Sequence, residues 1–159
     1  MNRRVEEFLA ARLAAYDVVP HPEAFTAQEQ AAAAHVSGWS WAKVVAVKKE
    51  DGYALAVLPA ACVIDLGMLR GLMGREMVEL ACVEEIVRLA PDCEPGALPP
   101  FGRLFGVPTF ADEALVNQRE ITMPAGDRAT AVRMRATEFV RLAAPRVGRF
   151  AVPESVAAG

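Results

Sequence analysis

Few residues in this 159-residue chain could act as covalent nucleophiles. Serine occurs only at positions 37, 40 and 155, and no GxSxG sequence places one on a nucleophile elbow. None of the three lysines follows a glycine, which excludes a phosphate-binding loop of the Walker A type, and no GxGxxG sequence follows a predicted strand. An enzyme built on this chain must therefore use chemistry outside the standard serine hydrolase and nucleotide-binding motifs.

The cysteines and histidines form no recognisable metal or redox motif. The chain has three cysteines, Cys62, Cys82 and Cys93, and no two of them form a CxxC motif. The two histidines, His21 and His35, do not have the spacing of metal ligands. We therefore predict no metal and no cofactor, with thiols that are reduced and mostly buried. A Cys–His pair that forms only in three dimensions remains open.

Lysine is rare, since Lys43, Lys48 and Lys49 stand among 17 basic residues. Lys43 directly precedes the apolar run 44–47 and is the one lysine that interrupts an apolar segment. Residues 91–102 hold four prolines and two glycines, which remove backbone donors and preclude regular structure. This lysine and this loop are the two local features that regular secondary structure does not explain.

The pattern of apolar residues and caps predicts one α/β domain over residues 1–159. The predicted helices cover residues 2–16, 27–35, 65–73, 83–89, 112–116 and 137–143, and the predicted strands cover 41–48, 53–58, 77–80, 107–111, 120–123 and 129–134. Thr26 and Glu29 form a capping box, and Asp51–Gly52 is typical of a hairpin turn. Hairpin and crossover connections both occur, so we expect an α+β arrangement with a mixed sheet flanked by helices.

Composition excludes disorder and a membrane span. Hydrophobic residues make up 53% of the chain and charged residues 23%, which is too apolar for a disordered protein. Pro59, Asp65, Arg70 and Arg75 interrupt the longest apolar stretches, so none reaches the roughly 20 residues that cross a bilayer. The first seven residues contain two acidic side chains where a signal peptide would become apolar, and we expect a cytoplasmic protein.

Charge is unevenly distributed along the chain, although the net charge is only −3. Residues 1–75 are balanced, residues 76–120 hold nine acidic and three basic groups, and residues 121–159 hold three acidic and six basic groups. This excludes a uniformly basic nucleic-acid-binding surface. The C-terminal arginines could meet phosphates, or they could be scattered over a solvated face.

An ordered set of short motifs resembles the YbaK/ProX family, the free-standing relatives of the editing domain inserted in bacterial prolyl-tRNA synthetases. The resemblance covers roughly residues 24–147. The motifs are Ala42–Val45, Glu94–Gly102, Pro108–Glu113, Ala125–Gly126 and Val132–Met134. Each motif is common when taken alone, and the specificity comes from their order and separation.

The resemblance implies a trans-editing aminoacyl-tRNA deacylase that hydrolyses the ester of a mischarged tRNA, such as cysteinyl- or alanyl-tRNA(Pro). It implies as partners the acceptor end of that tRNA, held weakly, and an aminoacyl-tRNA synthetase. The ester is already activated, so a strong side-chain nucleophile is not required. Backbone N–H groups of a proline-flanked glycine loop could stabilise the oxyanion, and Lys43 could supply a positive charge. The substrate's own ribose hydroxyl, or a cysteine thiol, would assist the attack.

Carried over residue by residue, the resemblance assigns catalytic roles to Lys43, Gly96 and Pro99. The residues expected to bind substrate are Ala97, Leu98, Phe101, Gly102, Asp112, Gly126 and His35. Six of these residues have a plainer alternative: Lys43 as a lysine that keeps a strand edge soluble, Gly96 and Pro99 as parts of a surface turn, Asp112 as an N-cap, His35 as a packing residue and Gly126 as a turn glycine.

The chain departs from the family pattern in two places. Many relatives have a small polar residue and a histidine where this chain has Asp127–Arg128, and the alanyl-specific branch has asparagine where Val44 follows the lysine. Neither the cysteinyl nor the alanyl assignment can therefore be transferred. A non-catalytic module that binds aminoacyl-adenosine, tRNA or a protein is the alternative function, and hydrolysis of a small ester unrelated to tRNA is a third.

Overall fold

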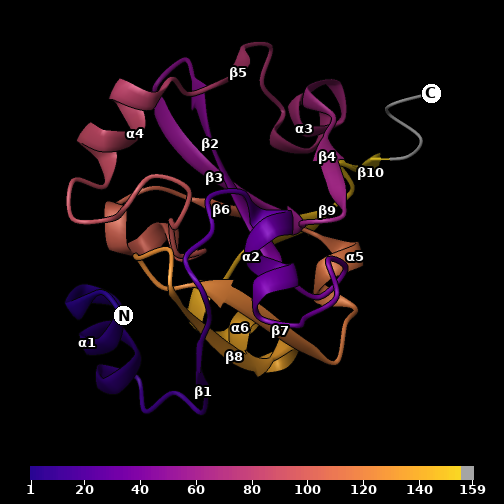
Figure 1. Ribbon diagram of the computed structural model, residues 1–159. Helices are drawn as coiled ribbons and strands as arrows, with labels where there is room; N and C mark the ends of the chain where they lie inside the picture. Colours follow the sequence, from indigo (N-terminus) through magenta and orange to yellow (C-terminus); the bar gives the residue numbers. More distant parts are fainter. Residues whose placement is uncertain (155–159) are drawn as a thin grey trace.

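A mixed five-stranded sheet organises the computed structural model, which describes residues 1–154 (Figure 1). Its strand order is β5-β2-β3-β6-β9, with β2 Ala42–Lys49, β3 Gly52–Pro59, β5 Val78–Leu80, β6 Thr109–Asp112 and β9 Arg146–Gly148. β2 is antiparallel to β3 and β5, whereas β6 is parallel to β3 and β9. The predicted mixed sheet is therefore confirmed.

The β2–β3 hairpin carries the predicted lysine. The two-residue turn is Glu50–Asp51, one position before the predicted Asp51–Gly52, because Lys49 pairs with Gly52; the register pairs Lys43 with Leu58. β3 is buried from Ala54 to its end, as expected of a strand with neighbours on both sides. In the apolar run of β2, residues 46 and 47 are buried, whereas residues 44 and 45 are only partly buried.

Two smaller sheets complete the fold. One is antiparallel, in the order β1-β8-β7, with β1 Asp17–Pro20, β7 Glu120–Pro124 and β8 Thr130–Arg135. The other pairs β4 Cys62–Ile64 with β10 Ala151–Pro153. A single bridge between Trp41 and Thr122 connects the start of β2 to β7, and so brings the hairpin next to the end of the three-stranded sheet.

Six α-helices lie among the described residues, together with a short 3-10 helix, η1. Their bounds are α1 Arg3–Ala11, α2 Ala27–Ala33, α3 Leu66–Met73, α4 Val83–Leu89, η1 Gly102–Phe105, α5 Glu113–Val116 and α6 Ala136–Ala143. The capping box of Thr26 and Glu29 at α2 is confirmed, as is the Asp65 cap of α3. In Figure 1 the three-stranded sheet lies with α1 and α6 in the lower half of the view, and α3 and α4 lie in the upper half.

Two helices end earlier than the sequence predicts. α1 stops at Ala11, and Leu13 beyond it has a φ of 50° and is 89% exposed, because the chain leaves the helix to form β1 against β8. α2 ends at Ala33, and His35 has a left-handed φ of 57°. The prediction of mostly buried thiols is also wrong, since Cys82 is exposed and Cys93 only partly buried.

Packing in the largest apolar cluster anchors the proline-rich loop. The Phe101 ring lies 5.0 Å from Phe8 of α1 and 6.2 Å from Phe139 of α6, measured between centroids. Phe101 and Phe139 are fully buried. Burying large aromatic side chains is among the strongest stabilising contributions in a small domain. The irregular segment 91–102 is therefore fixed at its C-terminal end by the core.

Candidate active site

A cavity of about 600 Å³ lies where α2, the start of β2, the 94–98 loop and the end of β7 meet. Its lining includes Phe25, Lys43, Gly96, Leu98, Pro124 and Glu154. Apolar atoms make up much of this wall, while Lys43 is the one cation and Glu154 the one carboxylate among the lining residues of the described chain. The geometry thus combines an apolar pocket with a few converging polar groups, as small-molecule sites generally do.

Lys43, the second residue of β2, lines this cavity near the open end of the hairpin. Its Nζ donates a hydrogen bond to the carbonyl oxygen of Cys62 at 3.2 Å. No carboxylate of residues 1–154 lies within 4.0 Å of Nζ, so its charge is not neutralised by an ion pair in the described structure. β5 pairs with β2 only from Val47 onward, which leaves the edge of the strand open at Lys43. A partly buried ammonium with two spare donors is well suited to hold a carbonyl or phosphate oxygen.

Another part of the cavity wall is a tight turn that requires glycine. The N–H of Ala97 donates to the carbonyl of Glu94 at 3.0 Å, with Pro95 second and Gly96 third in the turn. The φ of Gly96 is +82°, as a type II turn demands. A Cβ on Gly96 would also lie 2.6 Å from the carbonyl oxygen of Phe25. The conformation and the close approach both exclude a side chain at this position.

Two backbone donors of this loop have no partner in the part of the chain that the structure describes. The N–H groups of Gly96 and Leu98 donate to no acceptor in residues 1–154, whereas that of Ala97 is used within the turn. Gly96 and Leu98 both line the cavity. Leu98 is buried, where an unpaired backbone N–H is rare, whereas Gly96 is exposed; both N–H groups are candidates for binding an oxygen of a ligand.

Nucleophilic thiol chemistry does not fit this environment. Burial, followed by the nearby negative charge of Asp112, raises the pKa of the Cys62 thiol. Burial raises the pKa of Cys93 to about 11, with a further contribution from Asp92. Both thiols are therefore protonated near neutral pH, and the protonated form is a poor nucleophile. Among the described residues no cluster of three or more His, Cys, Asp or Glu side chains could hold a metal ion.

Comparison with known proteins identifies the family. A profile described as the aminoacyl-tRNA editing domain matches residues 21–142. The chain belongs to the aminoacyl-tRNA editing domain family. The resemblance drawn from the motifs is confirmed, and the matched range agrees with the expected 24–147 to within a few residues. A sequence comparison with curated proteins finds no match.

Three solved structures share the editing-domain fold over nearly the whole chain. A candidate trans-editing enzyme for prolyl-tRNA synthetase is 27% identical, with a TM-score of 0.82 over 93% of this chain and 94% of that one. A structure from a study of epitope backbone grafting onto scaffold proteins is 26% identical, with a TM-score of 0.81 over 93% and 94%. The hypothetical protein APE2540 is 21% identical, with a TM-score of 0.84 over 94% and 100%, and supports the fold alone.

Within this editing domain, the predicted site residues separate into two groups. Lys43, Gly96 and Leu98 line the cavity. Several others position the loop from behind: Pro99 is buried, Ala97 accepts a bond at 2.9 Å from the Gly126 N–H, and Gly102 donates to Thr109 Oγ1 at 2.9 Å. Phe101 is the core anchor described above. None of these positioning residues is among the cavity-lining residues of the described chain.

Gly126 and His35 lie outside the cavity lining as well. The carbonyl of Gly126 accepts from the Glu94 N–H at 2.8 Å, so that this glycine ties the β7–β8 turn to the proline-rich loop through two backbone bonds. Its φ is +98°, and a Cβ would lie 2.2 Å from that of Asn2. His35 is exposed beyond the end of α2, and it is not among the lining residues.

Asp112 is buried and holds backbone rather than facing the cavity. Its Oδ1 accepts from the Ala114 N–H at 2.8 Å, which caps α5. Its Oδ2 accepts from the N–H groups of Phe150 and Ala151, both at 2.8 Å. Three donors thus satisfy the carboxylate, as a buried charge requires. In this arrangement Asp112 fixes the approach to β10, the strand that leads to Glu154 at the cavity.

Sequence reasoning missed several side chains that build the site. Phe25 and Glu154 line the cavity, and Gln30 of α2 donates from Nε2 to the carbonyl oxygens of Ala24 at 3.1 Å and Gly96 at 3.0 Å. Gln30 is almost fully buried. The sequence placed Gln30 only in a capped helix. A glutamine in such a helix is ordinarily solvent-exposed, so nothing indicated that it contributes to the site. Its burial arises only because the proline-rich loop packs against α2.

Proposed function

We propose that this protein is a trans-acting aminoacyl-tRNA deacylase that hydrolyses the ester of a mischarged tRNA of the tRNA(Pro) type. Family membership and the 27% identical candidate trans-editing enzyme support this assignment. The observation that carries it is the convergence of the Lys43 ammonium and two unpartnered loop amides on one cavity. Those groups suit the stabilisation of an oxygen that becomes negative during ester hydrolysis.

The proposed reaction needs no nucleophile from the protein. A water molecule, assisted by the free ribose hydroxyl of the terminal adenosine, attacks the ester carbonyl carbon. The carbonyl oxygen becomes negative and is stabilised by the N–H groups of Gly96 and Leu98, while Lys43 supplies positive charge beside it. The bond between the carbonyl carbon and the ribose oxygen then breaks. The ribose oxygen takes up the proton that the water loses, and the free amino acid leaves.

The cavity lining also bears on the substrate. Its walls include the apolar side chains of Phe25, Ala42 and Pro124, which favour an uncharged aminoacyl side chain. Glu154 is suited to pair with the α-ammonium group that every aminoacyl ester carries. An uncharged apolar or thiol-bearing amino acid fits this combination.

The test is ester loss from a panel of mischarged tRNAs, with wild type compared to Lys43→Met. We expect deacylation of at least one substrate and a loss of about 100-fold or more in Lys43→Met, the scale of losing one oxyanion-stabilising group. Lys48→Met is the matched control, because Lys48 lies on the same strand, pairs with Glu85 and is not among the lining residues. Equal rates for wild type and Lys43→Met would refute the proposal. Binding of a non-hydrolysable aminoacyl-adenosine without ester hydrolysis would favour the alternative, a binding module.

A further inference from the structure

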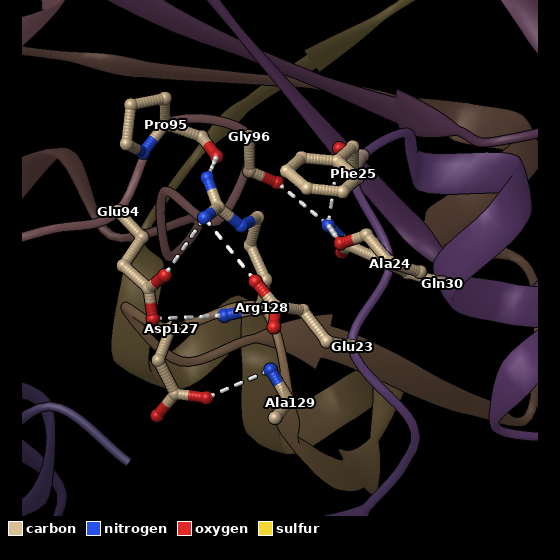
Figure 2. A network of polar contacts seen from close by, with 10 residues as sticks. All are labelled: Glu23, Ala24, Phe25, Gln30, Glu94, Pro95, Gly96, Asp127, Arg128 and Ala129. Atoms are coloured by element: carbon tan, nitrogen blue, oxygen red, sulfur yellow. Dashed lines mark hydrogen bonds and ion pairs between the residues drawn. The ribbon is translucent and has the colours of Figure 1, made fainter.

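Arg128 connects the 23–25 segment with the 94–96 turn (Figure 2). Its Nη2 lies 3.2 Å from Oε2 of Glu94 and 3.3 Å from Oε1 of Glu23, and its Nη1 donates to the carbonyl of Pro95 at 3.4 Å. Its guanidinium carbon also lies 4.5 Å from the centre of the Phe25 ring. One side chain thus contacts both the 23–25 segment and the 94–96 turn.

Both connected segments supply cavity wall. Phe25 and Gly96 line the cavity, and they approach so closely that the Phe25 carbonyl excludes any Cβ on Gly96. Gln30 donates to Ala24, Phe25 and Gly96, so it ties the same two segments from the side of α2. Figure 2 shows the Gln30 amide and the Arg128 guanidinium reaching these segments from different directions. The position of the Gly96 amide is therefore set by two side chains outside the loop itself.

The contacts of Arg128 use properties that only arginine combines. A planar guanidinium can lie against an aromatic ring and donate in its own plane to two carboxylates and a carbonyl. The side chain is 20% exposed, and its Nε is buried with no partner in the described structure. Lysine could keep the charge, but it could neither cover the ring nor bridge the three acceptors. This is also one of the two positions where the chain departs from the pattern of its relatives.

We propose that Arg128 is a positioning residue that holds the Phe25 wall and the 94–96 turn at a fixed separation, and so sets both the placement of the Gly96 and Leu98 amides and the width of the cavity. This inference rests on the proposed deacylase function for its catalytic consequence. Its structural consequence, the rigidity of two named segments, stands independently of that function. Exposed ion pairs at these distances contribute little to global stability, so we expect the effect to be local.

Hydrogen exchange provides the test that does not depend on activity. In Arg128→Met, amides in peptides covering residues 23–26 and 94–98 should exchange at least several-fold faster than in wild type. Arg133→Met is the matched control, because Arg133 lies on β8, contacts Asp17 and Glu120 at 3.6 and 3.5 Å, and is not among the lining residues. It should leave both peptides unchanged. Equal exchange of these peptides in wild type and Arg128→Met would overturn the proposal.

Kinetics supply the second readout on any substrate that wild type deacylates. We expect kcat to fall by up to about 100-fold in Arg128→Met, since misplacing a catalytic group by about 1 Å has that scale of effect, with a much smaller change in KM. Discrimination between small and larger aminoacyl groups should also weaken. Arg128→Lys should resemble Arg128→Met in both hydrogen exchange and kcat. If Arg128→Lys instead has the hydrogen exchange and kcat of wild type, charge alone is sufficient and the proposal is overturned. A wild-type protein that deacylates nothing would refute the proposed function, while exchange would still decide the role of Arg128.

Discussion

Replacing Gly96 with alanine tests the structural basis of the site most directly. The residue has a φ of +82°, and left-handed backbone costs a non-glycine residue about 1–2 kcal/mol. The new Cβ would lie 2.6 Å from the Phe25 carbonyl oxygen, and that backbone atom must retreat by about 0.4 Å to reach 3.0 Å. Its retreat strains the bonds from Gln30, and one hydrogen bond contributes about 0.5–1.5 kcal/mol. We therefore expect Gly96→Ala to lower the free energy of unfolding by about 2–3 kcal/mol.

Gly106 is the control that separates conformation from close approach. Its φ is +68°, but nothing lies within 4 Å of the position of its Cβ. Gly106→Ala should therefore lose only the conformational part, about 1–2 kcal/mol, and retain full deacylase activity. Urea denaturation gives both free energies, and single-turnover deacylation gives the chemical step, which we expect Gly96→Ala to slow by about 100-fold or more. Equal destabilisation of the two variants, with normal activity in Gly96→Ala, would refute this account of the turn.

Two further substitutions test residues outside the cavity. Asp112→Asn should lower the free energy of unfolding by about 2–4 kcal/mol, because an NH2 group replaces one of the two accepting oxygens and places a donor against at least one of the backbone N–H groups of residues 114, 150 and 151; normal stability in urea denaturation with a reduced kcat would instead favour a substrate-binding role. The second is Glu85→Gln. The Tyr53 hydroxyl, together with the Cys82 N–H and Lys48, lowers the pKa of Glu85 to about 2. A lowered pKa in the folded state stabilises the fold above the ordinary value of 4.5, and this stabilisation is lost as pH falls toward 2. The Tm difference between wild type and Glu85→Gln should therefore be full at pH 6–7 and shrink below about pH 4.5; a pH-independent difference would contradict it.

The elements that the sequence predicted well are those with local signals. The β2–β3 hairpin, whose turn lies one position earlier than predicted, the Asp65 cap and the helix from Val83 to Leu89 each depend on residues within a few positions of one another. β1, β4, β9 and β10 were missed, because each is three or four residues long and forms only by pairing with a distant segment. The same reason explains the overlong first helix, whose last predicted turn is replaced by the approach to β1.

The same distinction between local signals and contacts with distant segments applies to the candidate site. The family motifs pointed to the right segments, and Lys43, Gly96 and Leu98 of those segments line the cavity. What a motif cannot specify is which side of a loop faces the cavity, because that depends on where the core holds the other side. Here the Phe101 ring is fixed between α1 and α6, and the bonds of Gly126 hold the Glu94–Ala97 turn.

Arg128 illustrates the consequence for specificity. From the sequence it stood out only as a departure from the pattern of relatives, with no indication of what it contacts. The structure gives it partners from two distant places in the chain: Glu23 and the Phe25 ring in one segment, and the turn at Glu94 in the other. A residue that acts by holding two cavity walls together leaves no local signature, since its effect depends on contacts with residues 105 and 34 positions away in the chain. We therefore expect Arg128 and Phe25 together to determine which aminoacyl esters this domain hydrolyses. Replacing both residues in one variant should change the ratio of kcat/KM between two substrates by more than the effects of the two single replacements combined.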